Sequence, residues 1–235
     1  DLRYEHHVEE FFLNNKFDIL IIAAAKVGGI SANHNYPADF ISDNLRIQTN
    51  LIHLSHKHNI KKIIFIASCC IYPKECSQPM REEDLLTGPL EPSNEGYALA
   101  KIAGIKMCQA YYRQYGLKSF CPMPINLYGP FDNFHPENSH IIPGLINRLH
   151  DAKINKDHKT TVWGTGKPKR EFMHVDDCAD GILFANNFVN DGSIINIGPG
   201  KELTTFETAK KIANIVGYEG EILLDKSKLD GTMRK

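Results

Sequence analysis

Apolar segments of strand length alternate with amphipathic helical patterns along the first half of the chain. The apolar segments cover residues 17–25, 61–67 and 118–125, and the helical patterns cover about 37–58 and 94–115. Strands that are apolar on both faces and separated by helices are typical of parallel βαβ units. The pattern therefore predicts an α/β fold with a Rossmann-like, doubly wound parallel sheet.

The alternation loosens after about residue 126, where shorter strand-like runs lie between helices. This change indicates a second, smaller α/β lobe that is interwoven with the sheet. The elements expected there are helices at 140–150, 176–188 and 204–216 and strands at 160–163 and 193–197.

A glycine-rich turn is missing from the predicted sheet. A dinucleotide-binding sheet normally opens with a strand and such a turn, and has the strand order 3-2-1-4-5-6. The three apolar segments then correspond to strands 4, 5 and 6, and strand 17–25 becomes an exposed apolar edge. Because the chain also starts at Asp1 without a methionine, we expect it to be a fragment in which the N-terminal strands and the loop are missing.

Composition and charge exclude several classes of protein. The chain has 235 residues, 42% of them hydrophobic, with a net charge of −1, which suits a packed core but not nucleic acid or an anionic membrane as partner. No apolar run reaches the roughly 18 residues of a membrane span. Six cysteines without a signal-like start favour a reducing, cytoplasmic location and a soluble protein.

Tyr97 and Lys101 lie one turn apart on a predicted helix. An ammonium group beside a phenol favours the phenolate, so Lys101 is expected to lower the pKa of Tyr97. This spacing alone is weak evidence, because it is more often found on a solvated helix face. Ser68 strengthens the case for a catalytic role of Tyr97 and Lys101. It follows strand 61–67, at the edge where open α/β sheets bind ligands. Together these residues match the short-chain dehydrogenase/reductase superfamily, in which serine and tyrosine hydroxyls donate to a carbonyl oxygen while a nicotinamide supplies hydride.

Longer segments make the similarity more specific. These are Ala23–Ile30, Ser68–Pro73, Asn126–Pro130, Asp132–Pro136, Asn138–His140, Arg170–Asp177 and Asp230–Lys235. With these segments, essentially the whole chain resembles the GDP-L-fucose synthase family of extended short-chain reductases. The resemblance implies epimerisation of GDP-4-keto-6-deoxy-D-mannose at C3 and C5, followed by NADPH-dependent reduction at C4. It also implies a partial NAD(P)-binding domain at 1–135, a mainly substrate-binding lobe at 136–235, and a homodimer.

The epimerisations require two further groups that titrate near neutrality. The resemblance places Cys70 and His140 in these roles. Without it, a small buried cysteine and a surface histidine would be the simpler interpretations. Cys69 departs from the family pattern, which has serine there, and a thiol is a weaker hydrogen-bond donor. We therefore expect a small effect on cofactor affinity and none on the chemistry.

The resemblance also implies two sets of binding residues. Guanidinium groups suit a diphosphate, although isolated arginines more often form surface ion pairs and a tryptophan more often packs in a core. The expected substrate-binding residues are Arg148, Trp163, Arg170, Asp230 and Lys235. The expected cofactor-binding residues are Ile66, Ala67, Ser68, Cys69, Lys101, Pro124, Ile125, Asn126, Leu127 and His140.

No metal site is predicted. His53, His56 and His58 lie near a helix end, but no carboxylate or cysteine completes a ligand set, so a solvated helix surface is the simpler interpretation. In segment 174–177 we expect an aspartate to cap the following helix rather than to bind a metal.

Two alternatives stay open. One is another nucleotide-sugar epimerase or dehydratase of the same superfamily, although a dehydratase would be expected to carry an acidic pair where Cys69 and Cys70 stand. The other is a cofactor-binding fragment without turnover, because the pyrophosphate loop is missing. The residues that would meet the adenosine 2′ position are also missing, so the preference for NADP rests on the resemblance alone.

Overall fold

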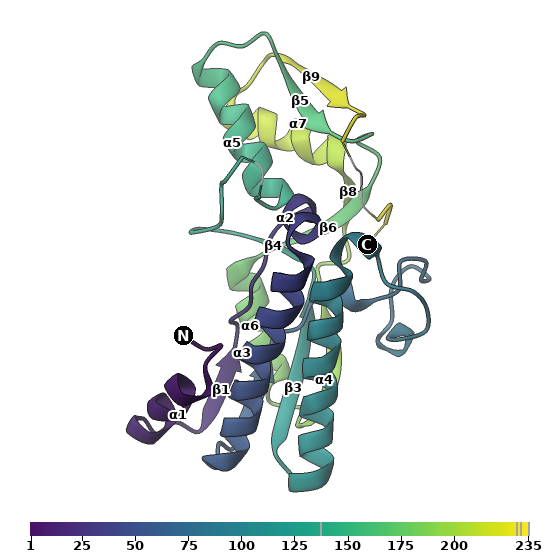
Figure 1. The fold of residues 1–235 in the computed structure, drawn as a ribbon. Coiled ribbons are helices and arrows are strands. Elements are labelled where there is room, and N and C mark those ends of the chain that lie inside the picture. The colour runs from purple at the N-terminus through teal and green to yellow at the C-terminus, as the bar shows by residue number, and fades with distance from the viewer. Residues whose placement is uncertain (137, 229, 231, 235) are drawn as a thin grey trace.

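Two lobes make up the computed structural model, which describes residues 1–136, 138–228, 230 and 232–234, without the side chains of residues 30 and 31 (Figure 1). The larger lobe contains a four-stranded parallel sheet in the order β1-β2-β3-β7. Its strands are β1 (Ile19–Ile22), β2 (Lys62–Phe65), β3 (Lys118–Pro124) and β7 (Asp191–Ile197). The predicted α/β fold class with a parallel sheet is confirmed.

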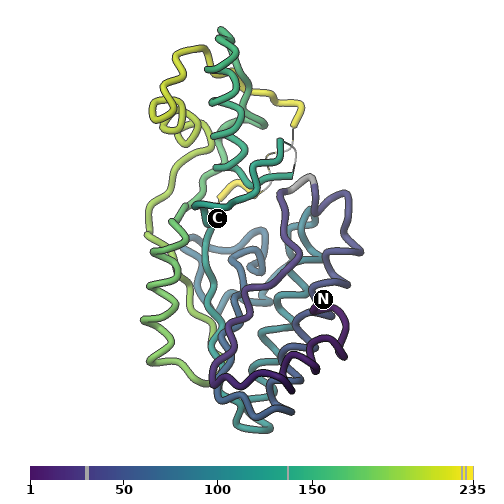
Figure 2. Tube along the Cα trace, turned by 90° about the vertical axis from the view of Figure 1, so that its left-hand side faces the viewer, coloured from purple at the N-terminus to yellow at the C-terminus, as the bar shows by residue number. Residues whose placement is uncertain are grey.

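Helices cover both faces of this sheet (Figures 1 and 2). On one face α3 (Pro37–Lys57) and α4 (Glu95–Tyr115) pack over Ile63 and Phe65. On the other face α6 (Val175–Ala185) packs over Ile64. Successive residues of β2 therefore enter different cores, which explains why Ile63, Ile64 and Phe65 are all apolar. Two short helices, α1 (Glu5–Asn14) and α2 (Ile30–Asn35), lie beside this lobe.

The sheet differs from the prediction in one strand. Residues 193–197 were assigned to the smaller lobe, but β7 pairs with β3 as a fourth parallel strand. Its short apolar core, Ile194 to Ile197, does not distinguish a sheet strand from a lobe strand by sequence alone. Strand β1 lies at the edge as predicted, and there Ile19 and Ile21 are 46% and 49% exposed.

The smaller lobe packs two helices against a two-stranded parallel sheet. Its elements are α5 (Ile141–Ile154), β5 (Lys159–Trp163), α7 (Thr205–Val216) and β9 (Glu221–Asp225). Leu149, Val162 and Ile212 form part of its own core. A separate three-stranded sheet connects the lobes. Its strands are β4 (Asn126–Tyr128), β6 (Lys169–His174) and β8 (Glu202–Thr204).

Helix α4 packs unusually close to β2. A β-carbon at Gly104 would overlap the ring of Phe65, so only glycine permits this approach. The close packing brings Tyr97 and Lys101, at the start of α4, to the carboxyl edge of the sheet. The loop after β2 begins with the 3-10 turn η1 (Cys69–Ile71) at the same edge, and further 3-10 turns, η2 (Glu82–Asp84) and η3 (Pro92–Asn94), lead into α4.

Within the described part of the chain, none of the helices has the length and apolar character needed to cross a membrane.

Candidate active site

A cleft of about 1250 Å³ lies where the carboxyl edge of the main sheet meets the smaller lobe. Every described residue that the sequence predicted as catalytic, cofactor-binding or substrate-binding lines this cleft. They come from the segment that follows β2, from η1, α4, β3, β4, β5 and β6, from α5 with its N-cap residue, and from the C-terminal segment. Lys235 lies outside the described residues. The structure thus gathers the predicted residues into one place, although their individual roles stay predictions.

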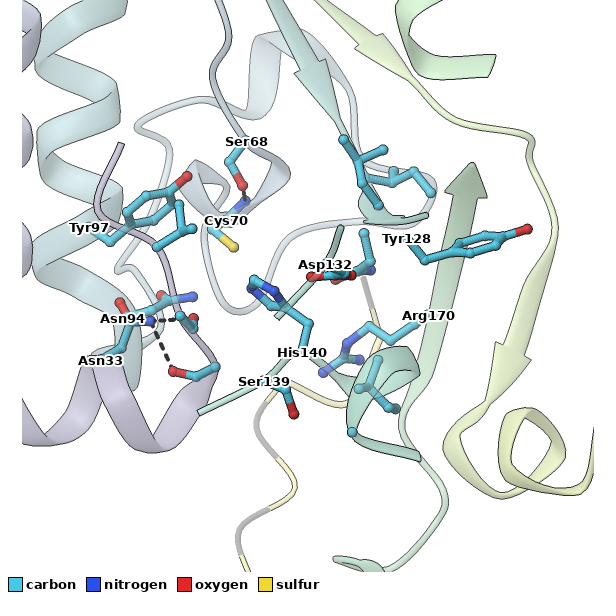
Figure 3. A pocket seen from close by; sticks show the side chains of 18 of the residues that line it. Asn33, Ser68, Cys70, Asn94, Tyr97, Tyr128, Asp132, Ser139, His140 and Arg170 are labelled. Carbon is cyan, nitrogen blue, oxygen red and sulfur yellow. Dashed lines mark hydrogen bonds between the residues drawn. The ribbon is translucent and has the colours of Figure 1, made fainter. Parts of the chain in front are cut away.

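Ser68 and Cys70 occupy the turn that follows β2. Ser68 has extended backbone, and its side chain accepts a hydrogen bond from the backbone N–H of Cys70 at 3.3 Å. This bond starts the η1 turn and fixes the position of Cys70 relative to Ser68. Both side chains are half-buried in the cleft wall, and Figure 3 shows the Cys70 thiol pointing into the cavity.

Tyr97 lies against this turn. Burial raises the pKa of Tyr97 above its ordinary value of 10.0, nearby Cys70 and Cys69 raise it further, and a hydrogen bond with Ser68 opposes the rise. The expectation that Lys101 lowers this pKa is therefore wrong in this structure. A phenol with a raised pKa is protonated at neutral pH, so it is suited to donating a proton rather than removing one.

The Lys101 side chain is directed instead to the backbone that follows β2. Its ammonium donates a hydrogen bond of 2.7 Å to the carbonyl oxygen of Ile66 and lies 4.9 Å from the centroid of the Phe65 ring. The distance to the centroid of the Tyr97 ring is 5.9 Å. Because the side chain is buried, desolvation lowers the pKa of Lys101 to about 8.

The lowered pKa of Lys101 predicts how the rate of reduction depends on pH. The charged form of Lys101 donates hydrogen bonds, so kcat/KM for the reduction is expected to fall about tenfold per pH unit above about pH 8. In Lys101→Arg the charge persists, because guanidinium pKa values exceed about 12. The decline near pH 8 should then disappear from a kcat/KM profile. A decline at the same pH in both proteins would contradict the assignment.

His140 faces the same space from the opposite wall. It is the N-cap residue of α5, where its side chain makes no capping hydrogen bond, and it is exposed. Figure 3 shows its imidazole directed toward the part of the cleft that carries Cys70, Ser68 and Tyr97. A thiol and an imidazole thus approach the cavity from different elements, as removal and delivery of protons on two faces of a sugar ring would require.

The carboxyl ends of β2 and β3 form the floor of the cleft. Ile66, Ala67 and Pro124 line the cleft there, and Cys69 beside them is only 4% exposed. Asn126 donates to the carbonyl oxygen of Glu171 at 3.0 Å, which joins β4 to β6. With the Lys101 ammonium beside them, these groups fit the nicotinamide half of a dinucleotide, which supplies hydride when it is bound.

Cationic and aromatic groups line the end of the cleft in the smaller lobe. The Arg148 guanidinium carbon lies 4.7 Å from the centroid of the Trp163 ring and Lys228 Nζ lies 5.2 Å from it. Arg148 also donates to the carbonyl oxygen of Thr161 at 3.0 Å. Arg170 is half-buried, and burial lowers its pKa, an effect that nearby Cys69, Cys70, Asp230 and Glu91 oppose. These positive groups suit the phosphates of a nucleotide.

Asp230 was expected to bind the substrate, but in the structure its carboxylate is hydrogen-bonded to the protein itself. Its Oδ1 accepts from the backbone N–H of Thr165 at 2.7 Å, and its Oδ2 accepts from the Thr165 hydroxyl at 2.7 Å. Two residues later, the hydroxyl of Thr232 donates to Glu91 at 3.2 Å. The C-terminal segment is therefore tied to both lobes at the cleft.

Several cleft residues were missed by sequence analysis. They are Asn33, Glu91, Asn94, Tyr128, Asp132 and Lys228. Asp132 and Tyr128 lie within segments that resemble the family, so a search of those motifs could have found them. Glu91 and Lys228 lie in loops without periodicity, and nothing in their sequence surroundings marks them.

The histidines near the end of α3 have ordinary structural partners. His53 Nδ1 lies 2.9 Å from the Tyr111 hydroxyl, and His56 stacks on Tyr115 with ring centroids 4.0 Å apart. At the start of α6 the cap is His174, whose Nδ1 accepts from the backbone N–H of Asp176 at 3.3 Å, so the predicted aspartate cap is wrong. Among the described residues, no group of three or more histidines, cysteines or carboxylates is arranged to hold a metal ion.

Comparisons with known proteins identify the family of this chain. The model of the NAD dependent epimerase/dehydratase family matches residues 1–198. GDP-L-fucose synthase 1 of Arabidopsis thaliana is 54% identical over 235 residues, which are 100% of this chain and 73% of the relative. GDP-L-fucose synthase of Escherichia coli K12 is 49% identical over 97% of this chain and 74% of the relative.

A solved structure extends the similarity to three dimensions. The crystal structure of a GDP-L-fucose synthetase from Naegleria fowleri bound to NADP superimposes with a TM-score of 0.86 at 28% identity, covering 100% of this chain and 72% of that one. The resemblance inferred from the sequence motifs is thus confirmed. The chain belongs to the NAD-dependent epimerase/dehydratase family and, within it, to the GDP-L-fucose synthases.

Proposed function

We propose that this protein converts GDP-4-keto-6-deoxy-D-mannose to GDP-L-fucose by epimerisation at C3 and C5 and reduction at C4. Its identity of 49–54% to GDP-L-fucose synthases supports this function. The single observation that carries the proposal is that Ser68, Cys70, Tyr97 and His140 line one cleft. A plain ketone reductase needs the serine and the tyrosine but not the thiol and the imidazole.

In the proposed epimerisations, the C4 carbonyl makes the hydrogens at C3 and C5 acidic. Ser68 and Tyr97 donate hydrogen bonds to the carbonyl oxygen and stabilise the enolate that forms when a proton leaves. Of Cys70 and His140, one removes the proton from one face of the ring and the other delivers a proton to the opposite face. Their positions on separate walls of the cleft support this division.

In the proposed reduction, Tyr97 donates its proton to the C4 oxygen as hydride reaches the carbon. Burial supports this role, because it raises the pKa of Tyr97 and keeps the phenol protonated. Lys101 holds the backbone of Ile66 at the proposed cofactor end of the cleft, because its ammonium group donates a hydrogen bond to that carbonyl oxygen.

The nucleotide contacts are part of the proposal. Arg148 and Arg170 bind the diphosphate of the substrate, and Trp163 packs beside its nucleoside. The residues expected at the sheet edge, from Ile66 to Cys69 and from Pro124 to Leu127, contact the cofactor. The positive groups around Trp163 support an anionic ligand at this end of the cleft.

We further propose NADPH as the reductant, supported by the NADP-bound relative. A homodimer, a cytoplasmic location, and the division into a cofactor-binding domain at 1–135 and a substrate-binding lobe at 136–235 stay predictions from the sequence.

The test is a coupled assay with purified protein and GDP-4-keto-6-deoxy-D-mannose. We expect one NADPH oxidised per GDP-L-fucose formed, with NADH used at a lower kcat/KM, as measured by absorbance and by chromatography of the product. A product that keeps the manno configuration at C3 and C5 would favour a plain reductase. Binding of NADPH without any turnover would favour the non-catalytic alternative.

A further inference from the structure

The turn between β5 and β6 carries the two ends of the nucleotide site. Trp163 is the last residue of β5, and Arg170 is the second residue of β6. The turn between them includes Gly164 and Gly166, which have positive φ angles of 82° and 72°. Glycines in this region of backbone space leave a turn without side-chain packing of its own, so its position depends on partners elsewhere.

Asp230 is the main side-chain partner of this turn. Both of its carboxylate oxygens are hydrogen-bonded to Thr165, each at 2.7 Å. A β-carbon at Gly164 would overlap Asp230 Oδ1, so the carboxylate lies directly against the turn backbone. Met233 adds a bond from the same segment, because its carbonyl oxygen accepts from Lys169 N at 2.8 Å.

These contacts show that Asp230 holds the turn. Its carboxylate accepts one hydrogen bond from the backbone N–H of Thr165 and one from the Thr165 hydroxyl. Thr165 itself does not line the cleft, whereas Asp230, Trp163 and Arg170 do. Thr165 can therefore affect a ligand only through the position of the turn.

We propose that Asp230 and Thr165 form one latch that holds the β5–β6 turn, and that Asp230 thereby acts as a positioning residue for the nucleotide site. The latch fixes Trp163 and Arg170 at the separation that a nucleoside diphosphate requires. The inference rests on the proposed function for the identity of this ligand, but not for the latch itself.

The test is a double-mutant cycle with GDP as the probe. Asp230→Ala, Thr165→Val and the double variant are compared by titration with GDP, and Thr165→Ser is the matched control because it keeps both donors. Trp163 is the only tryptophan, so intrinsic fluorescence reports on the turn directly. Thermal unfolding shows whether each variant is folded, and the nearly isosteric Thr165→Val carries the test if Asp230→Ala unfolds.

We expect each single variant to bind GDP about tenfold more weakly, as befits loss of a hydrogen bond to a charged group. The double variant should be no weaker than Asp230→Ala, because the two residues act as a unit. KM for the substrate should rise while kcat stays within about twofold, and Thr165→Ser should match the unmodified protein.

Two results would overturn the latch. One is unchanged GDP affinity in Thr165→Val with weaker affinity in Asp230→Ala, and the other is additive losses in the double variant. Failure of the unmodified protein to bind GDP would contradict the proposed function instead. The ligand-free emission of Trp163 then decides the inference: the same change in both single variants supports it, and a change in only one contradicts it.

Discussion

Replacing Tyr97 with Phe is expected to lower the rate of C4 reduction by about 10²–10⁴-fold, the usual contribution of a positioned proton donor. The change removes the phenol proton that must reach the ketone oxygen, while Ser68 can still donate a hydrogen bond to that oxygen. Proton exchange at C3 and C5 should therefore continue, although more slowly. Stopped-flow NADPH oxidation measures the reduction, and NMR of substrate incubated in deuterated water measures the exchange.

Tyr128→Phe is the matched control for this experiment. Tyr128 also lines the cleft, but Figure 3 shows its hydroxyl pointing away from Cys70 and His140. Its ring packs edge-on against His174, with centroids 5.5 Å apart. Tyr128→Phe should therefore keep near-normal reduction. A Tyr97→Phe variant that reduces the substrate as fast as Tyr128→Phe would remove Tyr97 from the mechanism.

The second large effect is expected from the epimerising pair. Cys70→Ser and His140→Gln should each lower deuterium exchange at C3 and C5 by about 10²–10⁴-fold, because neither a hydroxyl nor an amide titrates near neutrality. The exchange is measured by NMR in deuterated water without NADPH, so that reduction cannot obscure it. The variants should still reduce a substrate that already has the epimerised configuration.

Cys69→Ser is the matched control, because it changes the neighbouring thiol and restores the residue that the family usually carries. Cys69 is 4% exposed, so this variant should exchange protons at nearly the rate of the unmodified protein. Normal exchange in both Cys70→Ser and His140→Gln would refute their assignment as the acid and base.

The main elements of the sheet could be predicted from sequence because buried parallel strands are apolar on both faces. Lys62–Phe65 is such a strand, with all of its residues buried. The helix that carries Tyr97 and Lys101 was likewise predicted, at 94–115 against Glu95–Tyr115 in the structure. Ser68 and Tyr97 could be placed together because the carboxyl ends of parallel strands and the following helices meet at one edge of the sheet.

Other features depend on contacts between distant segments, which a single sequence does not encode in any local pattern. The pKa of Tyr97 is set by burial among Ser68, Cys69 and Cys70 rather than by the lysine one turn away. Asp230 finds its partner in Thr165, 65 residues earlier in the chain. Strand β7 pairs with β3 in the main sheet, and its Ile195 and Ile197 pack in the same core as Ile64 and the helix α6.

The account depends on a thiol and an imidazole exchanging protons in the cleft where a tyrosine donates one. The most direct measurement is the isotopic pattern of the product formed in deuterated water with unlabelled NADPH, determined by NMR. The account predicts GDP-L-fucose with deuterium at C3 and C5 and protium at C4. Protium retained at C3 and C5 would contradict it, because inversion at these carbons would then not proceed through exchange with protein groups in contact with solvent.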